Sequence, residues 1–457
     1  MTPDRQTASR GVIRSRFPGY RREAFRTTLW VVPATMVVSA LVLFLITYHV
    51  DARVRAGTIR LPAWAIAGEP SAARQVLIGI AAAVITVAGV VFSITILALQ
   101  LASQQFGPRM LRNFIRDAGT QASLGAFVAT FVYSVLTLGA VAHGSPGFVP
   151  HVSVTVALVL TLGDLGVLIY FIHHVASTIQ LTSVVDGIAR DFRSTVRELN
   201  DEAARTRARA TDVGPDLREI RVRLQAGSPV PAHQSGFLQA VGHERLVQIA
   251  TSSDAVISLL HRPGHFVVEG QPLALVWPVH AADQVSQALT SEHIVGANRT
   301  LTQDPGFAVD QLVEVAIRAL SPAVNDTFTA LNCVDWLGDC LCRVARDPLP
   351  DGVYRDALGA VRLVDRPITF DRLVKGASDK IRQAGRGMPA VLIRQLENLH
   401  KVASALPTTD GTDVIARHAE MILRASEDSV SEPGDRADVQ AAFDSLTLAI
   451  ERATSGA

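Results

Sequence analysis

Four long apolar stretches in the first 180 residues constrain this chain more than any other feature of its sequence. They run over residues 29–50, 75–102, 123–142 and 152–174. Each is long enough to cross about 30 Å of hydrocarbon, which takes about 20 helical residues. The first stretch follows the Arg-rich residues 1–28 and precedes no small-residue cleavage site, so we expect a membrane span and not a cleavable signal. The sequence therefore predicts a four-helix transmembrane bundle.

Arginines flank these spans unevenly. They are dense in residues 1–28, in the loop 103–122 and directly after the fourth span, whereas the loop HGSPGFVPH (143–151) carries no charged residue. The loop between the first two spans is the exception, with Arg53, Arg55, Arg60 and Arg74. By the positive-inside rule we expect a multi-pass protein of the cell (plasma) membrane, with both termini in the cytoplasm.

The rest of the chain reads as an α+β cytoplasmic domain. The apolar stripe Val185, Ile188, Phe192, Val196 and Leu199 continues the fourth span as a helix. Short strands are expected at GFLQAV, AVISLL and PLALV, and a further strand-like segment at 361–370. Helical patterns begin at Asp304, and the last four cover 371–384, 389–406, 412–428 and 435–453. The expected domains are an Arg-rich arm (1–28), a four-span domain (29–180), a connecting helix (181–212), a small β-rich module (213–298) and a mainly helical domain (299–457).

Composition argues against several classes of function. Residues 1–200 hold 17 of the 43 basic residues but only 9 of the 42 acidic ones, so the soluble part is acidic and nucleic-acid binding is not expected. Cys333, Cys340 and Cys342 crowd into one predicted helix without nearby histidines, which predicts buried thiols and neither a disulfide framework nor a zinc site. No catalytic motif is present, so we expect neither an enzyme nor a cofactor or metal.

Asp164 is the sharpest candidate for a functional residue. It lies midway along the fourth span, and no span contains Lys or Arg to neutralise it. A charge at mid-membrane costs a few kcal/mol and usually faces the bundle interior or a wet cavity. Asp164 is therefore a candidate ion or proton site. Its candidate partners at similar depth are Thr161, Thr130, Tyr133, Ser134 and Thr137. The alternative is a hydrogen-bonded or protonated side chain that fixes helix packing beside Gly163 and Gly166.

The second span carries a face of mostly small or polar residues. Thr86, Gly89, Ser93, Leu97, Gln100 and Gln104 fall on that face at helical spacing. Such a face is typical of a pore lining, with Ser93, Gln100 and Gln104 as its polar members. It is equally typical of a seam where helices pack closely.

Two further groups complete the candidates. His173 and His174 end the fourth span, where a proton relay to Asp164 or plain interfacial histidines are both compatible with the sequence. In the soluble part, Arg299, Asp304, Ser321, Asn325 and Asp326 predict either a ligand pocket or subunit contact, or helix caps and turns.

Several strings in this chain resemble domain-of-unknown-function family 2254, which comprises predicted bacterial membrane proteins. The strings are SITILALQLASQQFGPRMLRNFIRD (93–117), FIHH (171–174) and RTLTQDPGFAVDQLVEVAIRALSPAVNDTFTALN (299–332). The chain departs from the family pattern at Asp326-Thr327, where Asp-Pro is usual. The resemblance implies four membrane spans and a C-terminal soluble part, and it implies no activity.

Two hypotheses for the function follow. The first is a homo-oligomeric ion channel or transport-type protein, in which the second span lines the path and the cytoplasmic domain regulates or assembles it. The second is a membrane-anchored sensor or scaffold, whose cytoplasmic domain binds a small ligand or a protein partner.

Overall fold

The structure, a computed structural model, describes residues 30–60, 65, 69–106, 117–141, 148–178, 181–207 and 217–455. The described chain divides at Ser183 and Val184 into two compact units, which we call the membrane domain and the C-terminal domain. The expected fold class, a four-helix membrane bundle followed by a mixed α+β domain, is confirmed.

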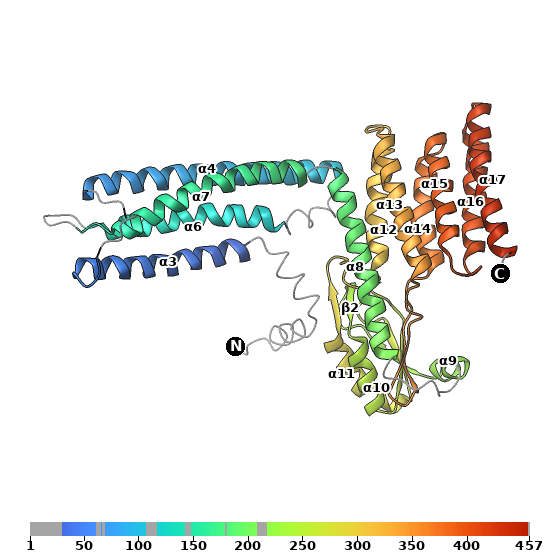
Figure 1. Cartoon of the computed structure of the whole chain (residues 1–457). Coiled ribbons are helices and arrows are strands. Elements are labelled where there is room, and N and C mark those ends of the chain that lie inside the picture. Colours follow the sequence, from blue (N-terminus) through green and yellow to red (C-terminus); the bar gives the residue numbers. More distant parts are fainter. Residues whose placement is uncertain are drawn as a thin grey trace. The chain divides into compact units, whose positions relative to one another are not determined.

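The membrane domain is a bundle of four long helices (Figure 1). They are α3 (Val31–Arg55), α4 (Pro70–Phe106), α6 (Ala118–Ala140) and α7 (His151–Thr178). All four are long and apolar enough to cross a membrane, so the predicted spans are confirmed as helices. Helix α6 packs against each of the other three. Leu77, Val91, Phe127 and Phe171 are fully or almost fully buried in the bundle core.

The C-terminal domain begins with the amphipathic helix α8 (Leu181–Arg207). Its predicted apolar stripe is confirmed, because Val185, Ile188, Phe192 and Val196 are fully buried. The short helix α9 (Leu217–Gln225) follows.

The β-rich module contains two sheets. Strands β1 (Ser228–Pro231), β5 (Pro272–Trp277), β3 (Val256–Leu259), β8 (Val361–Val364) and β7 (Val353–Arg355) form the first in that order. Strands β4 (Phe266–Val267), β2 (Gly236–Val241) and β6 (His293–Gly296) form the second. The strands predicted at GFLQAV, AVISLL and PLALV are β2, β3 and β5.

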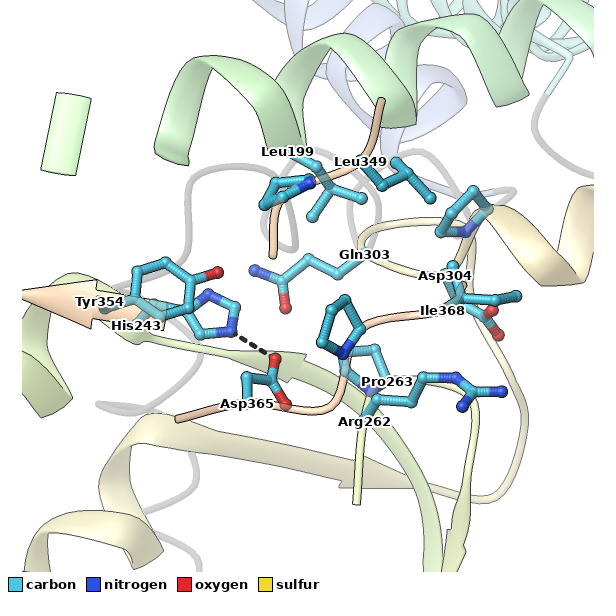
Figure 2. Close-up of a pocket in the computed structure, with 13 residues that line it drawn as sticks. Leu199, His243, Arg262, Pro263, Gln303, Asp304, Leu349, Tyr354, Asp365 and Ile368 are labelled. Atoms are coloured by element: carbon cyan, nitrogen blue, oxygen red, sulfur yellow. Dashed lines mark hydrogen bonds and ion pairs between the residues drawn. The ribbon is translucent and has the colours of Figure 1, made fainter. Parts of the chain in front are cut away.

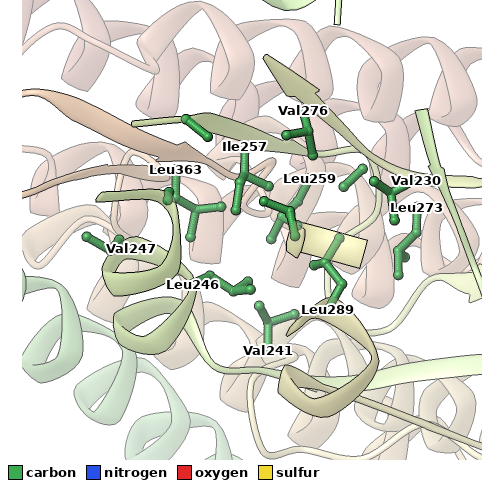
Figure 3. Close-up of a cluster of buried hydrophobic side chains, with 14 of the residues drawn as sticks. Val230, Val241, Leu246, Val247, Ile257, Leu259, Leu273, Val276, Leu289 and Leu363 are labelled. Atoms are coloured by element: carbon green, nitrogen blue, oxygen red, sulfur yellow. The ribbon is translucent and has the colours of Figure 1, made fainter. Parts of the chain in front are cut away.

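Two helices and two distant strands complete this module. Helices α10 (His243–Ser252) and α11 (Ala282–Glu292), which the sequence analysis did not predict, contribute Leu246 and Leu289 to its core. These side chains gather with Ile257 and Leu363 beside the larger sheet (Figure 3). Strand β8 pairs with β3 in parallel although about 100 positions separate them. The module therefore extends beyond residues 213–298, because residues 353–364 contribute two of its strands.

Six helices form the rest of the domain. They are α12 (Pro305–Ala319), α13 (Thr327–Arg346), α14 (Phe370–Ala384), α15 (Pro389–Ala405), α16 (Thr412–Ser429) and α17 (Pro433–Ser455). The four expected after residue 370 are present within a few residues of their predicted limits. Cys333 and Cys340 are buried free thiols in α13, as the sequence predicts, whereas Cys342 is only partly buried. Burial raises the pKa of Cys333 to about 12.

Candidate functional site

The buried face of α6 is mostly polar. The side chains that this helix turns into the bundle are Gln121, Ser123, Phe127, Thr130, Tyr133, Ser134 and Thr137. Outward-facing positions of the neighbouring helices, such as Ile85 and Phe92 of α4, are apolar. This arrangement suits a bundle in lipid, where polar groups find partners only inside the protein. We call the polar groups along this buried face, with their partners on α3 and α7, the polar track.

Asp164 lies at the middle of the polar track. Its side chain is 6% exposed and hydrogen-bonds to Thr130, one of its predicted partners. The carboxylate oxygen Oδ2 has no hydrogen-bond partner. Within the described membrane domain, one other buried side-chain atom lacks a hydrogen-bond partner. It is Ser134 Oγ, which lies one helical turn after Thr130 on α6. Two buried polar atoms at mid-bundle, one on α7 and one on α6, therefore lack a hydrogen-bond partner.

One end of the polar track is closed by Asp51 of α3. This carboxylate is 2% exposed and accepts hydrogen bonds from the backbone N–H groups of Val152 and Ser153, at 2.8 and 2.9 Å, and from Ser153 Oγ at 2.7 Å. These donors lie in the first turn of α7, where the helix dipole favours a negative charge. The Tyr133 hydroxyl hydrogen-bonds with Thr47 at 2.8 Å and also bonds to Ser153. Tyr133 therefore links three helices near Asp51.

The other end of the polar track is formed by Asp117 and His174. His174 Nε2 lies 2.7 Å from Asp117 Oδ2, and the His174 ring stacks on Tyr170. Asp117 also caps α6 by accepting from the backbone N–H of Thr120. Gly119 provides the space for this contact, because a Cβ there would lie 2.6 Å from His174 Nε2. His173 is exposed, so the two predicted histidines take different roles.

The polar track has the length of a membrane crossing. From Asp117 to Thr137 the helix rises by about 30 Å, at 1.5 Å per residue, which equals the thickness of a hydrocarbon core. The spacing is not uniform, since the buried ring of Phe127 lies between Ser123 and Thr130. Hydroxyl and amide side chains thus lie between the carboxylates at the two ends and in the middle, and the apolar ring of Phe127 interrupts them.

The small and polar face of the second span does not join the polar track. Thr86, Gly89, Ser93, Leu97 and Gln100 are all exposed on α4, and a Cβ on Gly89 would meet no atom within 4 Å. Thr86 and Ser93 hydrogen-bond only to carbonyls of their own helix. The side chain of Gln104 lies outside the described residues. This face is therefore open to lipid or to another protein. Asp164 is not part of it, because that side chain is buried inside the bundle.

The candidate residues of the C-terminal domain form two separate groups. Arg299 binds Asp304 through Nε and Nη2, at 2.9 and 2.7 Å, and Asp310 through Nη1 at 2.6 Å. Asp304 also caps α12 through the N–H of Phe307. Burial raises the pKa of Asp304, although the Arg299 charge acts in the opposite direction.

Ser321, Asn325 and Asp326 lie in the turn between α12 and α13, where Asn325 has a positive φ of 48°. Asp326 caps α13 by accepting from the backbone N–H and the hydroxyl of Thr329. The five residues predicted as one pocket therefore do not form one. Capping, the alternative interpretation, is confirmed for Asp304 and Asp326.

A pocket that the sequence analysis missed lies beside Asp304. Figure 2 shows His243 and Tyr354 on one side of it, and Asp304, Ile368 and Arg262 on the other. His243 is almost fully buried, and its two ring nitrogens lie 3.1 Å from carboxylate oxygens of Glu202 and Asp365. Burial alone would lower the pKa of His243, but the bonds to Asp365 and Glu202 raise it to about 9. The Tyr354 ring stacks on the imidazole at a centroid distance of 4.6 Å.

Comparison with known proteins gives a family but no activity. The family model described as predicted membrane protein (DUF2254) matches residues 26–401. The uncharacterized protein Rv1290c of Mycobacterium tuberculosis is 34% identical over 393 residues, which is 84% of this chain and 74% of the relative. The uncharacterized protein Mb1321c of Mycobacterium bovis matches with the same identity and coverage. No solved structure matches the chain.

Proposed function

We propose that this chain, which belongs to the DUF2254 family of predicted membrane proteins, is a transport-type protein. In this proposal it moves a proton or a small cation through its membrane domain. The polar track of α6 is the proposed path. Its central station is Asp164, and its ends are the Asp117–His174 pair and Asp51.

The unpartnered carboxylate oxygen of the buried Asp164 carries this proposal. A carboxylate oxygen buried in a membrane bundle without a donor is costly, and a proton or a cation removes that cost. Hydroxyl groups both donate and accept, so Thr130, Ser134 and Tyr133 are suited to pass a proton onward. The buried ring of Phe127 is the proposed gate, since an apolar constriction stops ions until it moves.

The proposed direction follows from the arginine-rich flanks. With the N-terminus and the C-terminal domain in the cytoplasm, Asp117 and His174 face the cytoplasm and Asp51 faces the outside. A neutral imidazole has one nitrogen that donates and one that accepts, so His174 beside Asp117 is suited to relay protons at this end of the polar track.

We also propose that the protein forms homo-oligomers through α4. Ser93 and Gln100 point outward at membrane depth, where lipid tails offer them no hydrogen bonds. Facing copies of the same helix supply such bonds, and Gly89 lets their backbones approach closely.

Ion flux in reconstituted liposomes tests the path. We expect the wild-type protein to collapse a pH or cation gradient and Asp164→Asn to slow that collapse at least ~10-fold, because the central ionisable group is removed. Gln100→Ala is the matched control on the outward face, and its flux should equal that of the wild type.

Two results contradict this path. A loss of flux in Gln100→Ala with normal flux in Asp164→Asn places the path between copies, along α4. Wild-type liposomes that are as tight as empty ones remove the transport function altogether.

A second candidate function is a membrane-anchored sensor whose C-terminal domain binds a small ligand. The pocket between His243 and Asp304 supports it, because its walls come from separate segments of the chain, including Leu199 of α8. A ligand there contacts the helix that directly follows the fourth span.

A further inference from the structure

The C-terminal end of α3 carries arginines that the proposed path does not use. Arg53 and Arg55 lie there, in the segment whose positive charge departs from the positive-inside rule. The guanidinium carbon of Arg55 lies 5.0 Å from the centre of the Phe148 ring, so this side chain is held by packing. Arg53 is exposed, and among the residues that the structure describes it forms no ion pair. Its guanidinium is therefore open to a ligand.

The carboxylate closest to Arg53 in sequence, Asp51, lies on the opposite side of the helix. Asp51 is buried and accepts hydrogen bonds from the backbone N–H groups of Val152 and Ser153. Residues two apart in an α-helix are separated by about 200° around its axis, since 3.6 residues make one turn. Asp51 therefore faces the polar track, whereas Arg53 faces the surroundings of the bundle.

Aromatic side chains mark the level of the membrane surface at this end of α3. The ring of Tyr48 packs edge-on against that of Phe148 at a centroid distance of 6.2 Å, and Arg55 packs on the same Phe148 ring. Tyrosine and arginine at the ends of spans typically lie where hydrocarbon meets headgroups. The apolar stretch of this span ends at residue 50, so Arg53 lies about one turn beyond it, at the depth of lipid phosphates.

A groove beside α3 runs from this level toward the middle of the membrane. Its volume is about 450 Å³, and it is lined by Val42, Leu45, Ile46, His49, Val50 and Arg53. These positions recur at intervals of three and four residues, so they form one continuous stripe along the helix. The deeper part of the stripe is apolar, and its two polar members lie at the end near the membrane surface. The groove therefore has the same division into apolar and polar parts as a phospholipid.

The groove also has the length of one lipid leaflet. From Val42 to Arg53 the helix rises by about 16 Å, at 1.5 Å per residue. Half of a hydrocarbon core of about 30 Å is about 15 Å, which is the depth that the acyl chains of one leaflet fill. Lipid can reach this face, because α3 lies at the edge of the bundle and packs mainly against α6 (Figure 1). Only 17% of its most apolar stretch is buried, against 33–39% for the other three spans.

We propose that this groove is a binding site for an anionic phospholipid. Arg53 holds the phosphate through paired hydrogen bonds, since a guanidinium matches two phosphate oxygens. The imidazole of His49, one helical turn deeper, donates an N–H to the phosphate or to an ester oxygen. One acyl chain lies along Val42, Leu45 and Ile46.

The charge of Arg53 favours an anionic headgroup over a zwitterionic one. Phosphatidylcholine offers the same phosphate but brings its own cation beside it, whereas phosphatidylglycerol leaves the negative charge to the protein. The inference goes beyond ion flux, and it needs only that this end of α3 lie at a membrane surface, whichever surface that is. Lipid binding is measured without flux, so either result stands if the other fails.

Native mass spectrometry of the full-length protein in neutral detergent tests the site. The protein is titrated with phosphatidylglycerol or with phosphatidylcholine of equal chain length. We expect one phosphatidylglycerol per chain to bind ~10-fold more tightly than phosphatidylcholine. Arg53→Gln should remove that preference, and Arg53→Lys should retain part of it, since it keeps the charge and loses the paired geometry. Arg60→Gln, an equal change of charge at an exposed position outside the groove, is the matched control and should keep the preference.

A second arm tests the apolar part of the groove. Ile46→Trp places a large side chain inside it, and we expect weaker binding of both lipids. Val38→Trp adds the same bulk at an outward position of α3 apart from the six lining residues, and it should bind lipid as the wild type does. Millimolar glycerol phosphate should not displace phosphatidylglycerol, because the buried acyl chain supplies much of the affinity.

Thermal unfolding in the same detergent provides an independent measurement. A ligand that binds only the folded protein raises its melting temperature. Phosphatidylglycerol should therefore raise the melting temperature of the wild type and of Arg60→Gln, but not that of Arg53→Gln. This comparison remains valid if a variant is less stable, because each protein is measured with and without the lipid.

Four results would overturn the inference. The first is equal affinity of the wild type for the two lipids. The second is an equal loss of preference in Arg53→Gln and Arg60→Gln, because the effect is then one of net charge. Displacement by glycerol phosphate would show a site for a soluble phosphate compound, and dimers that exclude lipid would show that a second copy of the chain covers this face of α3.

Discussion

His243 shows how strongly one side chain depends on its surroundings. It is buried between Glu202 of α8 and Asp365, which follows β8, and it is stacked on Tyr354. An isolated buried imidazole would be neutral. The nearby His293 is an example, because burial and the charge of His243 lower the pKa of His293 to about 4. The carboxylates of Glu202 and Asp365 reverse that outcome for His243. The positively charged His243 side chain therefore holds α8 against the β-rich module.

This cation makes stability dependent on pH. The pKa of His243 is about 9 in the folded protein and about 6.5 in the unfolded chain, so its contribution is complete below pH 6.5 and disappears as pH rises to 9. We expect the free energy of unfolding to fall by about 3 kcal/mol over that interval. Denaturant unfolding of the full-length protein at several pH values measures this, and His243→Gln should flatten the profile. Substitution of the exposed His280 is the control, and an equally flat profile for the wild type would contradict the role of His243.

The candidate residues differ in how well the sequence predicted them. Asp164 was identifiable because a carboxylate within a long apolar run is conspicuous. Asp51 and Asp117 lie at helix ends, where acidic residues are common in any sequence, and only the fold shows that they are partners of α7. Arg262 and His243 carry no local signal, since their importance depends on segments about 40 to 120 positions away.

Among the elements, α6 is the one on which the membrane domain is built. Polar groups cover its buried face, and two glycines allow close packing: a Cβ at Gly125 would meet Met36 of α3, and one at Gly119 would meet His174 of α7. The helix therefore joins its neighbours through both hydrogen bonds and small residues, as is usual in membrane bundles.

A methyl group at Gly119 tests this packing. Gly119→Ala places Cβ 2.6 Å from His174 Nε2, so we expect the Asp117–His174 contact to separate and the protein to lose about 1–3 kcal/mol of stability. Gly139→Ala on the same helix is the control, because nothing lies within 4 Å of its Cβ, and the helix gains from alanine. Thermal unfolding in detergent compares the two. Equal melting temperatures would show that α6 and α7 are not packed closely here.

At this scale the sequence predicted helices better than strands. The spans, α8 and α14 to α17 have apolar residues at helical spacing, which is a signal contained within each segment. Strands β7 and β8 are short, and they join a sheet whose other members lie about 100 positions earlier. Helices α10 and α11 were missed because they interrupt a run of strands. The sequence does not record which distant segments pair.

At the scale of the whole molecule, the outward face of α4 is the surface through which copies are proposed to assemble. Cross-linking tests this directly. In a Cys342→Ser background, which removes the half-exposed native thiol, Ser93→Cys should form disulfide-linked dimers under mild oxidation in vesicles. Ala157→Cys, fully buried inside the bundle, is the control and should remain monomeric on gels. Dimers that fail to form at Ser93, or that form equally at both positions, would contradict assembly through this face.

The parallel pairing of β3 with β8 determines how late in synthesis the larger sheet can be completed. A ribosome completes β3 at Leu259, but its partner strand emerges only when Val364 has been added. Throughout that interval one edge of β3 has no neighbour, while the spans are already being inserted and α12 and α13 are being synthesised. The nascent domain therefore needs protection of an exposed strand edge late in synthesis, and truncation before Val364 leaves that edge permanently open to aggregation.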